Sequence, residues 1–220
     1  MIDMKPTVVS VNVGRVVETP GSLLGRTGID KHPVDGRVRA HVTGLEGDAC
    51  ADEIHHGGVD QAVYAYAGED MDRWAAALGR ELIGGAFGEN LTTRGIDLGD
   101  ALIGERWRVG EVEFEVASPR TPCGTFQNHM KQPHWVRRFT LDGQTGAYLR
   151  VLSAGTVGAG DPIEVVFRPD HGLTVLETFR ALSTERYLLP KLVDIPQLPT
   201  KYRERAAEYV TAQARLLTGP

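Results

Sequence analysis

The chain has 220 residues, of which 41% are hydrophobic and 24% charged, and its formal net charge is −5. These values are ordinary for a folded globular protein and argue against a disordered chain. The acidic balance argues against a general nucleic-acid binder, because such proteins carry a basic face. No stretch approaches the ~18 apolar residues of a membrane span, and the N-terminus lacks the apolar run of a signal peptide, so we expect a cytoplasmic protein.

Short β-like segments dominate the first three quarters of the chain. The clearest is 105–116, where apolar residues alternate with glutamates around a Gly-Glu turn, a pattern typical of a hairpin. One helix is predicted over 69–78, with Gly79 placed where a C-terminal cap belongs. Further strands are expected near residues 8–13, 38–42, 62–66, 146–152 and 162–167. Many short strands with glycine-rich links predict a mainly β fold with some α, built as a closed or partly closed β-barrel over 1–168.

The composition changes beyond the last of these strands, and the segment 169–220 predicts an appendage of three short helices. Thr174 and Glu177 have the spacing of a capping box, which marks the start of the first helix. The other two are expected over 187–193, which contains a proline, and over about 200–217. The charged residues of these helices are typical of a solvated helix surface, and a docking surface is the alternative.

One cysteine lies in a stiff segment directly after the predicted hairpin. In Ser-Pro-Arg-Thr-Pro-Cys-Gly, residues 118–124, two prolines fix two φ angles and Arg120 places a positive charge three residues before Cys123. A thiol in a rigid, electropositive loop is suited to act as a nucleophile or as a soft metal ligand. The alternative is a cysteine that only packs in the core. The other cysteine, Cys50, lies in an acidic polar stretch, and we expect both to be reduced and Cys50→Ser to be nearly silent.

Two further segments combine glycines with polar side chains. His55 and His56 precede two glycines and Asp60, and at most one of these histidines faces a site because adjacent extended residues point to opposite sides. The alternative for His56 is a hydrogen bond within its own loop. In residues 87–93, Asn90 and two threonines either cap a turn or bind the polar edge of a flat heterocycle.

Other kinds of site find less support in the sequence. The remaining histidines are scattered without the spacing of zinc ligands, and neither of the glycine-rich phosphate-binding motifs is present. The segment around Cys123 has no local signature of a cysteine protease.

Five short motifs follow one another along the chain. They are Thr27-Gly28-Ile29-Asp30-Lys31 with Pro33-Val34, Gly44-Leu45-Glu46-Gly47-Asp48, His56-Gly57-Gly58 with Asp60, Phe87-Gly88-Glu89-Asn90-Leu91-Thr92, and Pro119-Arg120-Thr121-Pro122-Cys123. In this order they resemble the MOSC family, named for the C-terminal domain of molybdenum cofactor sulfurase, and in particular its YiiM-like bacterial branch. The resemblance covers about residues 7–168, and 169–220 is similar to the three-helix extension of YiiM-like proteins.

The resemblance implies a β-barrel that binds the molybdenum cofactor, a pterin dithiolene that carries a phosphate. It implies that Cys123 is the molybdenum ligand and the catalytic residue, which agrees with the preference of a soft thiolate for such a site. It also implies that His56, Asp60 and Asn90 lie around the pterin.

The phosphate contacts are less well defined by the resemblance. Lys31 and Arg120 are the candidates for the phosphate or for charge balance. In the related amidoxime-reducing branch an arginine stands two positions before the asparagine, and in this chain Gly88 takes that position.

Relatives that act as enzymes reduce N-hydroxylated compounds, including hydroxylamino purines and amidoximes. The resemblance therefore implies a molybdenum-cofactor-dependent oxidoreductase, and the alternatives are a non-catalytic cofactor carrier, a sulfur-transfer module, or an interaction protein with a degenerate site. Two cysteines cannot hold an iron–sulfur cluster, which takes four ligands, so we expect a separate reductase to supply electrons, with the tail helices as a candidate docking point. Neither a nucleic acid nor a membrane is expected as a partner.

Overall fold

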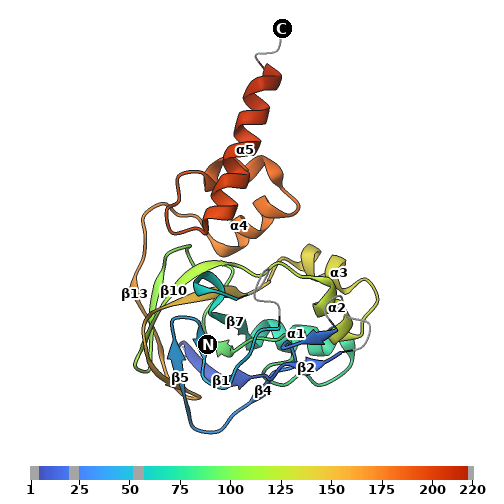
Figure 1. Cartoon of the computed structure of the whole chain (residues 1–220), viewed down its shortest axis with the longest axis vertical. Helices are drawn as coiled ribbons and strands as arrows, with labels where there is room; N and C mark the ends of the chain where they lie inside the picture. Colours follow the sequence, from blue (N-terminus) through green and yellow to red (C-terminus); the bar gives the residue numbers. More distant parts are fainter. Residues whose placement is uncertain (1–4, 20–24, 52–56, 218–220) are drawn as a thin grey trace.

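The fold is that of a computed structural model, which describes residues 5–19, 25–51 and 57–217 (Figure 1). The strands are β1 Thr7–Val13, β2 Val17–Glu18, β3 Arg26–Thr27, β4 His32–Pro33, β5 Arg37–His41, β6 Gly44–Leu45, β7 Val63–Ala67, β8 Leu91–Arg94, β9 Arg106–Val109, β10 Val112–Pro119, β11 Ala147–Ser153, β12 Gly155–Gly158 and β13 Ile163–Phe167. The helices are α1 Gly68–Leu78, α2 Gly124–Met130, α3 Trp135–Asp142, α4 Val175–Leu182 and α5 Thr200–Leu217, with 3-10 turns η1 Val59–Gln61 and η2 Arg186–Leu192.

The main sheet has eight strands in the order β13-β9-β10-β11-β7-β8-β1-β4, and a smaller sheet has the order β12-β5-β6. Within the large sheet only β7 and β8 run parallel. The sheet curls until its two sides meet: Val8 N–H donates to the Asp161 carbonyl at 3.0 Å, and Ile163 N–H donates to the Pro6 carbonyl at 2.8 Å. The mainly β fold with some α is thus confirmed, with a sheet that closes in part.

Local sequence explains the hairpin and the first helix. In β9 and β10 the side chains of Trp107, Val109 and Phe114 are buried on one face of the curled sheet, as their alternation requires. Gly110 turns between the two strands at φ 58°. Helix α1 ends at Gly79, whose φ of 62° is the left-handed conformation of a C-terminal cap. Both predictions are confirmed.

Helices α2 and α3 were not predicted. The sequence predicts only the helix over 69–78 before residue 168. The residues of α2 are mostly Gly, Thr, Asn and His, which are weak helix formers, and both helices are shorter than nine residues. Tertiary packing stabilises them: Phe126, Trp135 and Phe139 are fully buried in an aromatic cluster with Trp74 and Phe87.

The tail keeps part of its predicted plan of three short helices, since the second element is a 3-10 turn and α5 has 18 residues. Thr174 caps α4 by accepting a hydrogen bond from the Glu177 N–H at 3.0 Å, which confirms the predicted cap. The second element is a 3-10 turn, η2, with Pro190 inside it, and α5 spans the predicted residues. Leu189 and Leu192 are fully buried in the same apolar cluster as the barrel core. The boundary at residue 168 stays a prediction. Among the described residues, no helix combines the length and the hydropathy that crossing a bilayer requires.

Candidate functional site

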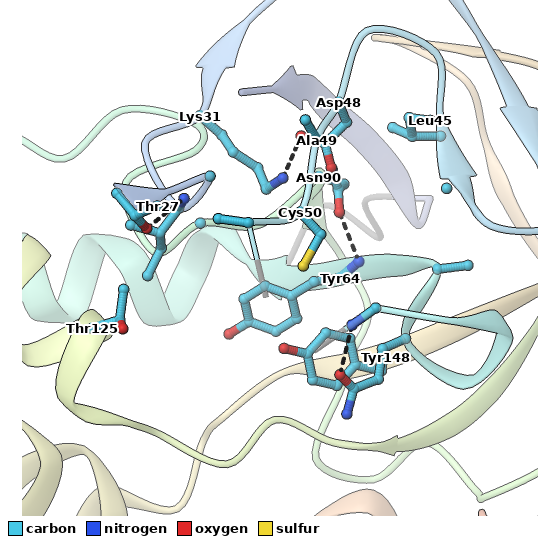
Figure 2. Close-up of a pocket in the computed structure, with 18 of the residues that line it drawn as sticks. Thr27, Lys31, Leu45, Asp48, Ala49, Cys50, Tyr64, Asn90, Thr125 and Tyr148 are labelled. Carbon is cyan, nitrogen blue, oxygen red and sulfur yellow. Dashed lines mark hydrogen bonds and ion pairs between the residues drawn. The ribbon is translucent and has the colours of Figure 1, made fainter. Parts of the chain in front are cut away.

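A cavity of about 790 Å³ lies between the curled sheet and α2, and residues from six separate parts of the chain line it. Figure 2 shows this pocket, with the sulfur of Cys50 directed toward the rings of Tyr64 and Tyr148. Its size falls within the range of cavities that bind small ligands and cofactors. The lining includes four of the predicted site residues: Lys31, Asn90, Arg120 and Cys123.

Cys123 is the residue directly before α2, and its backbone is extended, with φ −132° and ψ 173°. The thiol-bearing residue is half-buried and contacts the aromatic cluster that α2 and α3 complete. The two prolines therefore lead the chain from the end of β10 to a fixed point on the cavity wall. Cys50 is exposed and lines the same cavity from the opposite segment of chain, so the structure brings both cysteines to one site.

Arg120 is a buried cation on the wall of this cavity, only 5% exposed. Its guanidinium carbon lies 3.6 Å from the centre of the Phe126 ring and 5.1 Å from that of Tyr64, and Nη1 donates to the Phe87 carbonyl at 3.1 Å. Among the residues that the structure describes, no carboxylate forms an ion pair with it. Burial acts to lower the pKa of Arg120, but Tyr64, Tyr148 and Cys123 outweigh it and hold that pKa above its usual value, so the side chain stays charged.

Asp48 joins three parts of the site. One carboxylate oxygen pairs with Lys31 Nζ and accepts the Gly14 N–H at 2.9 Å, and the other accepts Asn90 Nδ2 at 2.9 Å. The side-chain amide of Asn90 makes two further hydrogen bonds within the protein. Its Oδ1 accepts a hydrogen bond from the Tyr64 N–H at 3.1 Å, and its Nδ2 also donates to the Asn12 carbonyl at 3.2 Å. Lys31 and Asn90 thus lie together on the cavity wall, but Asp48 balances the charge of Lys31.

Two tyrosines with tilted rings give the cavity an aromatic side. The ring centres of Tyr64 and Tyr148 lie 5.3 Å apart, and the Tyr64 hydroxyl donates to the Thr145 carbonyl at 2.8 Å. Burial raises the pKa of both tyrosines, so both stay protonated at neutral pH.

Glycines allow the segments of the cavity wall to come close. A Cβ on Gly28 would lie 2.1 Å from the Ala49 carbonyl oxygen, so only glycine lets these two segments meet. Gly88 has φ 74°, and a Cβ there would lie 2.6 Å from Cγ1 of Ile29. The arginine that the amidoxime-reducing branch carries at this position is therefore incompatible with the local backbone and packing.

Asp60 does not line the cavity in the structure. It lies in η1, and its Oδ1 accepts a hydrogen bond from Arg150 Nε at 2.6 Å. Arg150 also forms an ion pair with Glu115. His56 falls outside the described residues, so its predicted role stays a prediction.

Several residues that the structure brings to the site were not predicted from the sequence. Asp48 lies in a motif that was recognised, whereas Tyr64 lies in a strand that was expected only to pack. Tyr148 and Cys50 had no local signal, since their positions depend on strand pairing and on the close approach at Gly28. Within the described part of the chain, no group of three or more His, Cys, Asp or Glu side chains is arranged to hold a metal ion.

Comparison with known proteins places this site in a family. Residues 52–164, which include Asn90, Arg120 and Cys123, match the family model of the MOSC domain. The chain belongs to the MOSC domain family. This MOSC protein is 36% identical over 171 residues to YflK of Bacillus subtilis, with 77% of each chain covered.

Two further similarities extend the assignment. The crystal structure of YiiM from Geobacillus stearothermophilus superimposes with a TM-score of 0.78 and 28% identity, over 92% of this chain and 98% of that one. A protein of Gibberella moniliformis named "Reductase" is 32% identical over 209 residues, which are 90% of this chain but 37% of the fungal one. The MOSC protein thus spans little more than a third of that relative and nearly the whole of the bacterial structure.

Proposed function

We propose that the cavity binds the molybdenum cofactor and that this MOSC protein is an oxidoreductase. The observation that carries the proposal is the buried charge of Arg120, which lines the cavity together with Cys123. Arg120 forms no ion pair with a carboxylate among the described residues. A buried charge is costly unless it is paired, so the cavity favours an anionic ligand. A dithiolene with a phosphate group supplies that charge.

The residues present fit such a ligand. Cys123 would provide a soft thiolate ligand to molybdenum, and Arg120 would compensate the charge of the sulfur or phosphate groups. Tyr64 and Tyr148 offer aromatic surface to a fused ring, and Lys31 offers polar hydrogens on the same cavity wall. The cofactor, when bound, supplies two-electron chemistry at the metal.

Two of the predicted contacts have a framework role in this proposal. Asn90 uses its amide to fix Asp48 and the backbone of Tyr64, which holds the lining segments at their separation. Asp60 acts through Arg150, which anchors the turn η1 next to the glycines at 57 and 58.

The proposed reaction is the reduction of an N-hydroxylated compound, in which two electrons and two protons convert N–OH to N–H and release water. Membership of the MOSC family and the "Reductase" relative support the oxidoreductase class. Tyr148, which stays protonated, can donate a hydrogen bond to the substrate oxygen inside the cavity. Hydroxylamino purines and amidoximes are the substrates to test, because the resemblance to the MOSC family implies them.

Electrons would come from a separate reductase, because the two cysteines of the chain are too few for an iron–sulfur cluster. A cytoplasmic location fits such a partner and stays a prediction, as does docking at the tail helices.

The test is purification from a host that makes the cofactor, followed by elemental analysis for molybdenum and by an assay with a chemically reduced viologen dye as electron donor. We expect about one molybdenum per chain and turnover of a hydroxylamino purine. Protein that contains molybdenum but reduces no N-hydroxylated compound would indicate the alternative, a cofactor carrier or sulfur-transfer module. Protein that takes up no molybdenum under these conditions contradicts the proposal.

A further inference from the structure

The last turns of α5 extend away from the rest of the molecule (Figure 1). Every residue from Val210 to Leu216 is exposed, and Val210 and Leu216 are 39% and 78% exposed. Short helical segments are marginal in water unless one face packs against other structure. The exposed end of α5 therefore gains little stability from packing within the described part of its own chain.

One face of α5 forms a shallow groove. It is lined by Glu204, Ala207, Glu208, Thr211, Ala212 and Arg215. These residues recur at spacings of three and four, so they share one side of the helix. Tyr202, Ala206 and Tyr209 contact the apolar core from the opposite side. The groove thus faces away from the body of the protein, and its small residues allow another helix to approach closely.

The charged residues of the groove are ordered so that two antiparallel copies of α5 would place opposite charges next to one another. In an antiparallel pair centred between Thr211 and Ala212, Glu208 faces the partner's Arg215, and Arg215 faces the partner's Glu208. Neither Glu208 nor Arg215 forms an ion pair with another described residue of its own chain.

We propose that the occupant of this groove is α5 of a second copy of the chain, in a two-fold symmetric antiparallel helix pair. A two-fold interface must be self-complementary, and the pairing of Glu208 with Arg215 meets that condition twice. Small residues at the crossing are compatible with an interaxial distance of about 8–10 Å. Two short helical faces bury less than the ~1,200 Å² of a stable interface, so the dimer is weak and depends on concentration.

The test compares charge variants by sedimentation equilibrium over two orders of magnitude in protein concentration. Glu208→Arg and Arg215→Glu each place like charges opposite one another, and each should raise the dimer dissociation constant at least about tenfold. An equimolar mixture of the two variants restores opposite charges at both contacts, so it should form a heterodimer of near wild-type affinity. The double variant Glu208→Arg/Arg215→Glu should restore the homodimer for the same reason.

Gln213→Arg is the matched control, because it adds a cation to the same helix outside the groove, and it should leave dimerisation unchanged. Circular dichroism of each variant checks that α5 is retained. Wild-type protein that stays monomeric, or single variants that dimerise normally, would overturn the proposal. Loss in both single variants without recovery in the mixture would contradict the pairing and point to a different partner for this face.

Discussion

At the scale of single residues, the site depends on a thiol and a cation that the chain places three residues apart. Cys123 is fixed on the cavity wall by the residues that lead into α2, and Arg120 is buried between the rings of Phe126 and Tyr64. Aromatic faces stabilise a cation by about 2 kcal/mol when it is desolvated, which offsets only part of the cost of burying it. The remainder of that cost explains why this position favours an anionic ligand.

Replacing Cys123 with Ser should abolish molybdenum-dependent reduction and retain the fold, because Ser has nearly the same shape but is a poor ligand for a soft metal. Cys50→Ser is the matched control, since both residues line the same cavity, and it should leave the activity nearly unchanged. Molybdenum content, activity and melting temperature are measured for both. Equal activity in Cys123→Ser and wild type would exclude the ligand role.

Arg120→Met should lower the affinity for the cofactor at least about tenfold, because it removes the buried charge and keeps the apolar contacts. The free energy of unfolding of the cofactor-free protein should stay the same or rise, since an incompletely compensated buried charge is removed. Molybdenum content and denaturant unfolding give the two measurements. A variant that keeps its molybdenum but unfolds more easily would assign Arg120 a packing role.

At the scale of elements, glycines set how closely the cavity segments approach. Gly88 precedes β8 with a positive φ of 74° and lies against Ile29, while Gly28 lies against the carbonyl of Ala49. These contacts join segments far apart in the sequence. They explain why the chain carries glycine at the position where a related branch has arginine.

Gly88→Ala should destabilise the fold by about 1–3 kcal/mol, because it adds backbone strain and forces Ile29 to move. Gly172→Ala separates the two effects: Gly172 also has a positive φ, of 70°, but a Cβ there would have no neighbour within 4 Å. Denaturant unfolding of both variants is the measurement. We expect the larger loss at Gly88, and equal losses would show that the contact with Ile29 contributes nothing.

At the scale of the whole molecule, the tail and the curled sheet share one apolar core. Leu189 and Leu192 are buried in the cluster that contains Trp107, and Arg150 donates to the Gln197 carbonyl at 2.7 Å while it pairs with Asp60. The helical segment is therefore held to the sheet by both apolar and polar contacts. Arg150 thus connects Gln197 of the tail to Asp60 in the turn η1 beside the cavity.

The shared core predicts that the chain unfolds as one cooperative unit. Differential scanning calorimetry should show a single transition with equal calorimetric and van't Hoff enthalpies, recorded at low concentration so that association does not contribute. Two separate transitions would contradict this prediction and favour an independently folding tail.

The sequence by itself determined the strands with clear alternation, the cap at Thr174, the residue range of α5 and the family, because each rests on neighbouring residues or on a short motif. Helices α2 and α3 were decided by tertiary packing, since their weak intrinsic propensity is overcome only when Phe126 and Trp135 are buried. The placement of Asp60 on Arg150, and of Cys50 and Cys123 on one cavity, was also decided there. Those contacts join residues that are distant in sequence, and only strand pairing and close packing determine which of them meet.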